Sequence, residues 1–113
     1  MKIAFTSDIH GDITPQNRAL LPYLAAQVER LAPDAFVIAG DVANSLRGWR
    51  EALLPFQSLP ISKLIVPGNH DVWIESQNAL RRSQDSDWKY RVALPEIARD
   101  LGFHYLAGDP TVI

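Results

Sequence analysis

Cysteine is absent from the 113-residue sequence. This absence excludes disulfide bonds, thiolate zinc sites and cysteine nucleophiles, and it fits a reducing compartment. No apolar run approaches the length of about 18 residues that spans a bilayer, and the N-terminal stretch MKIAFTSD has too few apolar residues for the core of a signal peptide. We therefore expect a cytoplasmic protein without a membrane segment, in which any metal is held by oxygen and nitrogen ligands.

The sequence also lacks an excess of positive charge. It has 13 acidic residues against 11 basic ones, and the basic residues are scattered along the chain. This distribution is not typical of a nucleic-acid-binding protein. A hydrophobic content of 47% with 21% charged residues indicates a soluble globular chain. Since domains centre on about 100 to 150 residues, we expect one domain over residues 1–113.

Strand-like and helix-like patterns alternate along the chain. Buried strands are predicted at residues 2–6, 35–41 and 62–68. A helix should follow the first strand and begin near residues 17–21, so that Pro22 lies in its first turn. A second helix is predicted over residues 45–59, with a bend or an end near Pro55.

The C-terminal part continues this order. A helix is predicted at residues 94–102, with Pro95 in its first turn and Gly102 as its C-terminal cap. Residues 103–113 have the pattern of two strands that join near Gly108. Apolar strands that alternate with helices indicate an α/β fold with a mostly parallel sheet, flanked by helices and linked by right-handed crossovers.

Each of the first three strands is followed by residues that can bind metals or transfer protons, in the stretches SDIHGD, AGDVAN and PGNHD. Because the carboxyl ends of parallel strands meet at one edge of a sheet, five side chains should converge there: Asp8, His10, Asp41, Asn69 and His70. Asp8 and His10 are two residues apart, and such side chains point to the same side of an extended chain. Gly40 and Gly68 should let the backbone approach the site closely.

The types of these side chains limit which metals and which reactions are expected. Carboxylate, imidazole and amide groups suit Mn²⁺, Fe, Zn²⁺ or Mg²⁺. A carboxylate can also bridge two ions that lie roughly 3.5 to 4 Å apart, and such a pair polarises phosphoryl oxygens and lowers the pKa of bound water. His70 would then be free to act as a general acid for the departing oxygen.

The motifs DIH, GD and GNHD at the ends of successive strands resemble those of the calcineurin-like, binuclear metallophosphoesterases. The resemblance covers the whole chain and implies a four-layer sandwich that hydrolyses phosphate esters by attack of metal-bound hydroxide. It implies that Asp8 and His10 bind the first of two divalent ions and that Asp41 bridges both. Asn69 would bind the second ion, and His70 would lie near the leaving group.

The sequence differs from this family in its length and in its histidines. Family members are about twice as long, and a Gly-His and a Gly-His-x-His in their second half complete both metal sites. Neither motif is present here, and the third histidine, His104, lies in a predicted strand. The chain therefore resembles the N-terminal half of the fold, a truncated domain that alone should bind Mn²⁺ weakly and hydrolyse phosphate esters slowly or not at all. The alternative is a non-catalytic α/β fragment that binds a metal or a partner.

A half of the sandwich would also leave apolar surface uncovered. Three helices cannot bury all of the apolar strand residues Phe5, Val37, Ile65, Tyr105, Val112 and Ile113. Apolar patches and unpaired strand edges favour association. We therefore expect self-association, pairing with a separate chain that supplies the C-terminal half, or aggregation when the chain is expressed alone.

Structural roles compete with these functional ones. Asp8 and Asp41 could cap the helices that follow them, and Asn69 could be a turn residue in the left-handed conformation. His70 could be a hydrogen-bonded structural histidine.

For the remaining polar and aromatic residues a structural role is the simpler prediction. Asp12 should be solvated or part of a turn, and Asp71 should orient its loop rather than bind a metal. His104 should have no role in chemistry. Trp49 should pack in the core, whereas Trp73, two residues beyond the GNHD motif, could border a substrate cleft.

Overall fold

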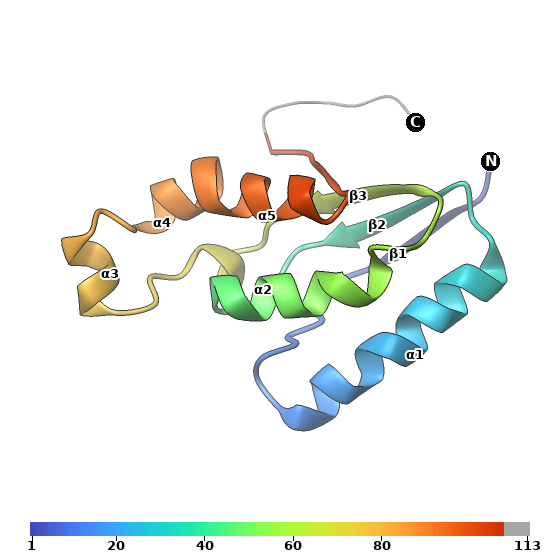
Figure 1. Ribbon diagram of the computed structural model, residues 1–113, viewed down its shortest axis with the longest axis horizontal. Helices are drawn as coiled ribbons and strands as arrows, with labels where there is room; N and C mark the ends of the chain where they lie inside the picture. Colours follow the sequence, from blue (N-terminus) through green and yellow to red (C-terminus); the bar gives the residue numbers. More distant parts are fainter. Residues whose placement is uncertain (108–113) are drawn as a thin grey trace.

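The fold is a parallel sheet covered by helices (Figure 1). The computed structural model describes residues 1–107. Its four strands pair in the order in which they occur in the sequence: β1 Ile3–Thr6, β2 Ala35–Ala39, β3 Ser62–Val66 and β4 His104–Tyr105. All three pairings are parallel, which confirms the predicted α/β class. The second strand predicted after Gly108 lies outside the described residues.

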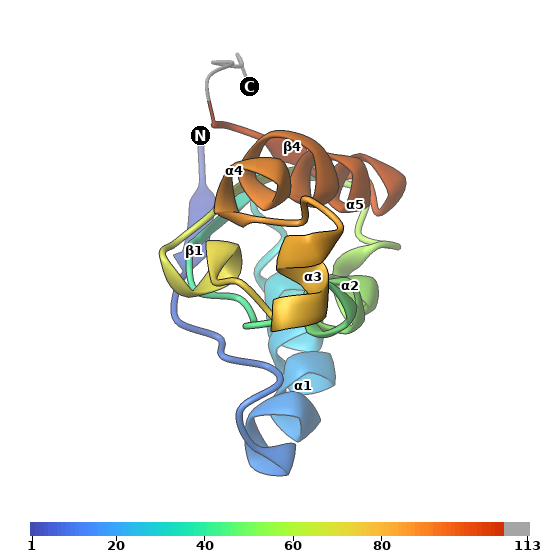
Figure 2. The same ribbon diagram turned by 90° about the vertical axis from the view of Figure 1, so that its left-hand side faces the viewer.

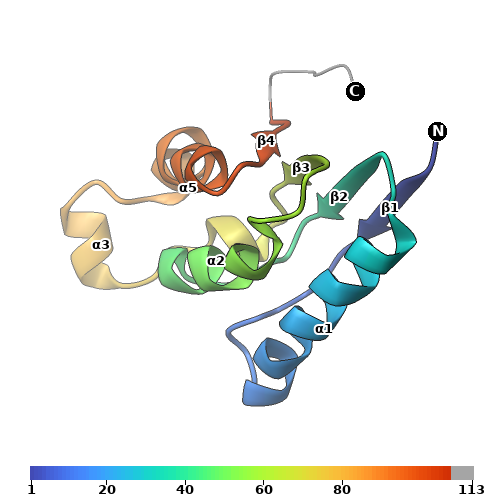
Figure 3. The same cartoon turned by 45° about the vertical axis from the view of Figure 1, so that its right-hand side comes forward.

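The strand order explains where the helices lie. Each new strand adds to the same side of the previous one, so right-handed crossovers place successive helices on one face of the sheet. The main helices are α1 Pro15–Leu31, α2 Leu46–Leu53 and α5 Leu94–Asp100. Figure 3 shows these helices together on one side of the four strands, whose other face carries no helix within residues 1–107.

The start of α1 differs from the prediction. The helix begins at Pro15, and the Thr14 hydroxyl caps it by accepting a hydrogen bond from the Asn17 N–H at 3.1 Å. Pro22 consequently lies inside the helix and not in its first turn. A capping threonine followed by proline at the first helical position strongly favours a helix start. The stability that this cap gives the helix outweighs the loss of the one backbone hydrogen bond that Pro22 cannot donate.

The other helix ends agree with the sequence. α2 stops at Leu53, and the 3₁₀ turn η1 Leu54–Phe56 carries Pro55. Gly102 follows α5 with a φ of +82°, which a glycine C-cap permits. Shorter elements connect β3 to α5: η2 His70–Val72, α3 Gln77–Arg81, α4 Ser86–Trp88 and the π-helical turn η3 Lys89–Ala93. No helix in the described part of the chain is both long and apolar enough to span a bilayer.

The core lies between the sheet and its helices. Its largest fully buried apolar side chains are Trp49, Phe36, Phe56, Ile38, Leu53, Ile65 and Leu94. Trp49 therefore packs as predicted. Ile65 does not belong to the uncovered apolar set, because it pairs with Ile38 and both residues are fully buried in this core. Phe5, by contrast, is 79% exposed, and the last two residues of the predicted set lie beyond the described range.

Candidate metal centre

Three of the predicted ligands meet at the carboxyl ends of β1 and β2. Asp8 and His10 follow β1, Asp41 follows β2, and each offers one ligand atom within 4.8 Å of the others. The Asp8 Oδ1 lies 3.7 Å from the His10 Nε2. Figure 2 looks towards this end of the sheet, where the segment from β3 to α4 passes close to the viewer. The three side chains are thus near enough to hold one ion together.

The backbone that presents these ligands is unusual. Asp8, His10 and Asp41 have φ values of 55°, 47° and 55°, and they are three of the five non-glycine residues with positive φ that the structure describes. Such left-handed residues cost roughly 1 to 3 kcal/mol each and gather at functional sites. The extended chain predicted for Asp8 and His10 is therefore wrong: they converge because both adopt a left-handed backbone, which aspartate and histidine tolerate better than most residues.

Hydrogen bonds between the two loops hold this backbone. The Asp8 N–H donates to the Gly40 carbonyl at 3.0 Å, and the His10 N–H donates to the Asp41 carbonyl at 3.1 Å. These bonds continue the pairing of β1 with β2 beyond the strand ends. The two ligand loops therefore form one rigid unit.

Asp71 organises the second ligand loop. Its carboxylate is buried, with a relative exposure of 1%, and it accepts four backbone N–H groups. The donors are those of Asp41, Val42, Ala43 and Gly68, at 2.8 to 3.0 Å. Because both of its oxygens are already engaged, Asp71 positions the loop as predicted and is not a ligand.

Two glycines allow this close approach. A Cβ on Gly40 would lie 3.1 Å from the backbone of Gly68, and Gly40 also has a φ of +88°. A Cβ on Gly68 would fall on the Oδ1 of Asp41 and 2.6 Å from its backbone nitrogen. The loops after β2 and β3 are therefore in backbone contact, as expected from the two glycines.

The residues present fit a divalent metal. The Nε2 of His10 lies 3.7 Å from the Asp8 carboxylate, on the side of the ring that faces the group. Two carboxylates and an imidazole are a donor set that Mn²⁺, Fe or Zn²⁺ accepts.

His70 lies directly beside this group. Its backbone N–H donates to the Oδ1 of Asp41 at 3.1 Å, and its ring meets the ring of His10 edge-on with a centroid distance of 5.2 Å. Its Nδ1 lies 3.2 Å from the Oδ1 of Asn44. On another side the ring of Trp73 lies against it, with centroids 3.9 Å apart and planes 34° from parallel.

Asn69 is the N-cap residue of η2 and lies in the loop that follows β3. Its φ of −66° and ψ of −35° are right-handed, so the alternative of a left-handed turn residue is wrong. The side chain is exposed, next in sequence to His70. Its part in binding a second ion stays a prediction.

Three residues important to this site were not predicted in their present roles. Asn44 contacts His70, and the buried Lys89 donates to the carbonyl of Asn44 at 3.2 Å. Asp12 lies in the turn of residues 11–13, as predicted, and its carboxylate also accepts the N–H groups of Asn44 and Ser45 at 2.9 and 3.0 Å, which holds the start of α2. These are contacts between distant segments, and no local pattern in the sequence signals them.

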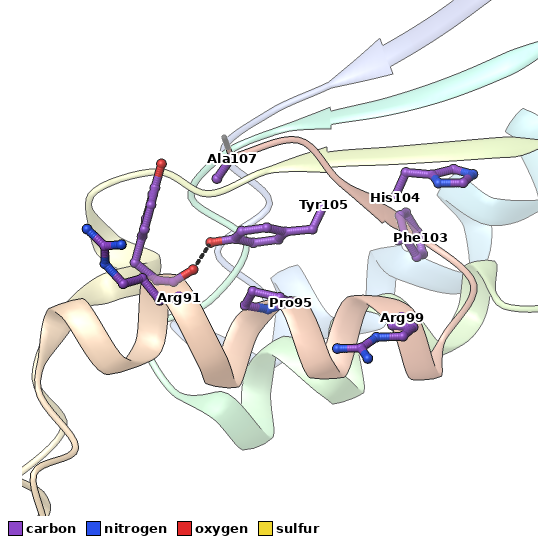
Figure 4. A pocket seen from close by; sticks show the side chains of 8 residues that line it. Arg91, Pro95, Arg99, Phe103, His104, Tyr105 and Ala107 are labelled. Carbon is purple, nitrogen blue, oxygen red and sulfur yellow. Dashed lines mark hydrogen bonds between the residues drawn. The ribbon is translucent and has the colours of Figure 1, made fainter. Parts of the chain in front are cut away.

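A groove with a volume of about 660 Å³ lies elsewhere, between α5 and β4 (Figure 4). Its lining residues are Tyr90, Arg91, Pro95, Arg99, Phe103, His104, Tyr105 and Ala107. The Tyr105 hydroxyl donates to the Tyr90 carbonyl at 2.8 Å, as the dashed line in Figure 4 shows. None of the metal-binding candidates lines this groove, and His104 thus belongs to a different surface.

Comparison with known proteins identifies the family and supports the fold. The sequence profile described as calcineurin-like phosphoesterase matches residues 1–110. The crystal structure of phosphopantetheinyl hydrolase from Mycobacterium tuberculosis is similar in fold, with a TM-score of 0.63 at 22% identity. The match covers 92% of this chain and 34% of that one, so this chain spans about a third of its structural neighbour. No curated protein matches the sequence. The chain belongs to the calcineurin-like phosphoesterase family.

Proposed function

We propose that this chain carries the ligand-bearing part of a metal-dependent phosphoesterase site, which hydrolyses a phosphate ester. The observation that supports this most directly is the convergence of Asp8, His10 and Asp41 beside His70. Membership of the family supports a phosphoester as the substrate class.

The proposed ligand roles are those that the family resemblance implies for these positions. Asp8 and His10 would hold one divalent ion, Asp41 would serve two ions, and Asn69 would supply an amide oxygen to the second. Ions of the Mn²⁺, Fe, Zn²⁺ or Mg²⁺ class polarise phosphoryl oxygens and make bound water more acidic. Asp71 contributes indirectly, because it keeps the backbone of Asp41 in place through their 2.9 Å hydrogen bond.

His70 is the proposed proton donor to the leaving oxygen. The carbonyl oxygen of the Asn44 amide can only accept a hydrogen bond, so the His70 Nδ1 carries a hydrogen in their 3.2 Å contact. As proton donor, His70 acts in its imidazolium form: the Nε2–H gives its proton to the leaving oxygen, and the neutral ring keeps the hydrogen on Nδ1. A residue held in this way by a partner on its other nitrogen keeps one orientation and one tautomer.

A non-catalytic metal-binding or partner-binding role is the second candidate. The observation that favours it is the position of the third histidine: His104 lines the groove at β4, so within residues 1–107 no further imidazole completes the group. An incomplete set of ligands binds its ions with low affinity, and weakly bound ions activate water less effectively.

Titration with Mn²⁺ and an assay with p-nitrophenyl phosphate test both candidates. We expect weak Mn²⁺ binding by calorimetry that Asp41→Asn abolishes, whereas Asp87→Asn, which removes an exposed carboxylate from a surface ion pair, leaves it unchanged. Slow metal-dependent hydrolysis that His70→Ala removes supports the phosphoesterase. Metal binding without hydrolysis supports the non-catalytic candidate, and binding that is insensitive to Asp41→Asn contradicts the metal centre itself.

The rate of hydrolysis also tests the incompleteness of the site. Ordinary enzymes turn over at about 1 to 10³ per second. Turnover of this order by the isolated chain, abolished by His70→Ala, would show that other groups complete the set of ligands, such as those of a second chain.

A further inference from the structure

A buried lysine lies between the segments that surround His70. Lys89, in the η3 turn, has a relative exposure of 1%. Its ammonium donates to the carbonyl of Trp73 at 2.9 Å and to the carbonyl of Asn44 at 3.2 Å. The Oε2 of Glu75 is 3.9 Å away. This one cation therefore joins the loop after β2 to the loop after β3.

Burial of a lysine is costly, which makes this contact informative. Loss of hydration lowers the pKa of the Lys89 ammonium, and the negative charges of Glu75, Asp71 and Asp12 partly oppose that effect. Lysine is rarely buried unless it is paired. The two carbonyls and the nearby carboxylate are the partners that make burial tolerable here.

Both residues that accept these bonds also contact the His70 ring, in addition to the edge-on contact of the His10 ring. The Oδ1 of Asn44 lies 3.2 Å from the His70 Nδ1, within hydrogen-bond distance. The Trp73 ring lies against the face of the imidazole, with centroids 3.9 Å apart. One contact restrains the direction of the ring, and the other restrains its tilt.

We propose that Lys89 is the positioning residue for His70: its ammonium fixes the backbone of Asn44 and of Trp73, and their side chains in turn fix the imidazole. The consequence for catalysis rests on the proposed phosphoesterase function, because only there does the orientation of His70 affect a rate. The consequence for the geometry of the ring does not depend on that function.

The chain contains a matched control for a buried ammonium. Lys63 in β3 has a relative exposure of 5%, and its ammonium donates to the carbonyls of Leu59 at 2.7 Å and Gln57 at 3.3 Å. Burial lowers the pKa of this lysine too. Its two partners precede β3, at the opposite end of the strand from His70. Lys63→Met therefore removes the same kind of interaction without touching the site.

The first experiment is nuclear magnetic resonance of the full chain without metal. In the native protein we expect cross-relaxation between the rings of His70 and Trp73, and ring-current-shifted imidazole resonances for His70. In Lys89→Met these resonances should move towards those of the exposed His104, and in Lys63→Met they should stay in place. Lys89→Gln keeps a neutral donor at this position and should give an intermediate shift.

Every outcome of this experiment decides the proposal. Equal shifts in the Lys89→Met and Lys63→Met proteins, or no shift in either, would overturn it. If Lys89→Met does not fold, Lys89→Gln and the native cross-relaxation decide in its place, and absence of contact between the two rings in the native chain would also overturn the proposal.

The second experiment measures hydrolysis of p-nitrophenyl phosphate with Mn²⁺. Loss of a group that orients a metal-site residue costs about 10- to 100-fold in activity, so we expect kcat to fall by this factor in Lys89→Met with little change in KM. Lys63→Met should retain the native kcat. No hydrolysis by the native chain would count against the proposed function, whereas the resonance shifts would still decide the role of Lys89.

Discussion

Asp71 shows how one side chain can serve a site without touching its ligand. Four backbone N–H groups point at its carboxylate, and three of them come from the segment that begins with Asp41. An ionised carboxylate accepts at both oxygens without donating. Asp71 therefore fixes the backbone of the loop that carries Asp41.

We predict that Asp71→Asn destabilises the protein by roughly 3 kcal/mol, because the amide nitrogen would face backbone donors and leave buried N–H groups unpaired. Urea unfolding measures the loss of free energy. Asp100→Asn is the control, since it removes an exposed carboxylate that pairs with Arg50 at 3.4 Å. An equally small effect in both variants would show that the Asp71 network contributes little.

Tyr105 gives a prediction for alkaline pH. Burial raises the pKa of its hydroxyl, and the charges of Tyr90 and Asp71 add to this effect. The unfolded chain releases this proton at about pH 10, so above that pH the unfolded state binds fewer protons than the native state and stability falls.

We expect Tyr105→Phe to lose less stability than the native chain between about pH 9 and about pH 11, as measured by urea unfolding. The buried lysines titrate in both proteins, so the difference in slope isolates Tyr105. The constant offset from the lost hydrogen bond to Tyr90 does not alter that slope. Parallel pH profiles would contradict the prediction.

Most helices and strands could be predicted from the sequence, because the apolar patterns and the residues that start or end them are local. Apolar runs predicted all four strands of the described sheet, and Gly102 and Pro55 predicted two helix ends. The predicted start of α1 is wrong because the adjacent pair Thr14–Pro15, whose capping interaction decides the helix start, outweighs the position of Pro22.

The meeting of three predicted ligands could be predicted from the sequence, whereas the backbone geometry that brings them together could not. Parallel strands end at one edge, so the meeting of Asp8, His10 and Asp41 followed from topology. Their left-handed backbone depends on hydrogen bonds between loops far apart in the sequence. The contacts of His70 with Asn44 and Trp73 likewise arise only when the folded loops meet.

The contact between these loops gives a prediction about Gly68. A side chain at this position would displace Asp41, so we expect Gly68→Ala to lower Mn²⁺ affinity by at least about tenfold, the size of effect known for groups that orient metal ligands. Calorimetry measures the affinity. Gly102→Ala is the control, because its φ of +82° makes alanine strained there, far from the site.

The two glycine variants should therefore separate stability from binding. Gly102→Ala should unfold at a lower urea concentration and keep its Mn²⁺ affinity, whereas Gly68→Ala should lose affinity. Equal affinities in both variants would show that Asp41 tolerates a shift of its loop.

In residues 1–107 the fold has two layers, a parallel sheet and a layer of helices that covers one of its faces (Figure 3). The other face of the sheet carries no helix within these residues. Apolar side chains remain exposed on the strands: Phe5 at 79%, Ile3 at 48% and Val66 at 38%. Phe5 pairs in register with Val37, and Val37 pairs with Leu64, so one face of the sheet carries a row of apolar residues that is exposed at Phe5, half-buried at Val37 and buried at Leu64. Such a row favours contact with another apolar surface.

We predict that the chain self-associates through this face, because association would remove its exposed apolar side chains from water. Size-exclusion chromatography with light scattering measures the mass. Phe5→Lys should shift the protein towards the monomer, since the charge would have to be desolvated at the interface. Tyr23→Lys should not, although Tyr23 on α1 is 72% exposed, because it belongs to the helical layer. A native monomer with low binding of the apolar dye ANS would contradict this prediction, and equal dissociation by both variants would place the interface elsewhere.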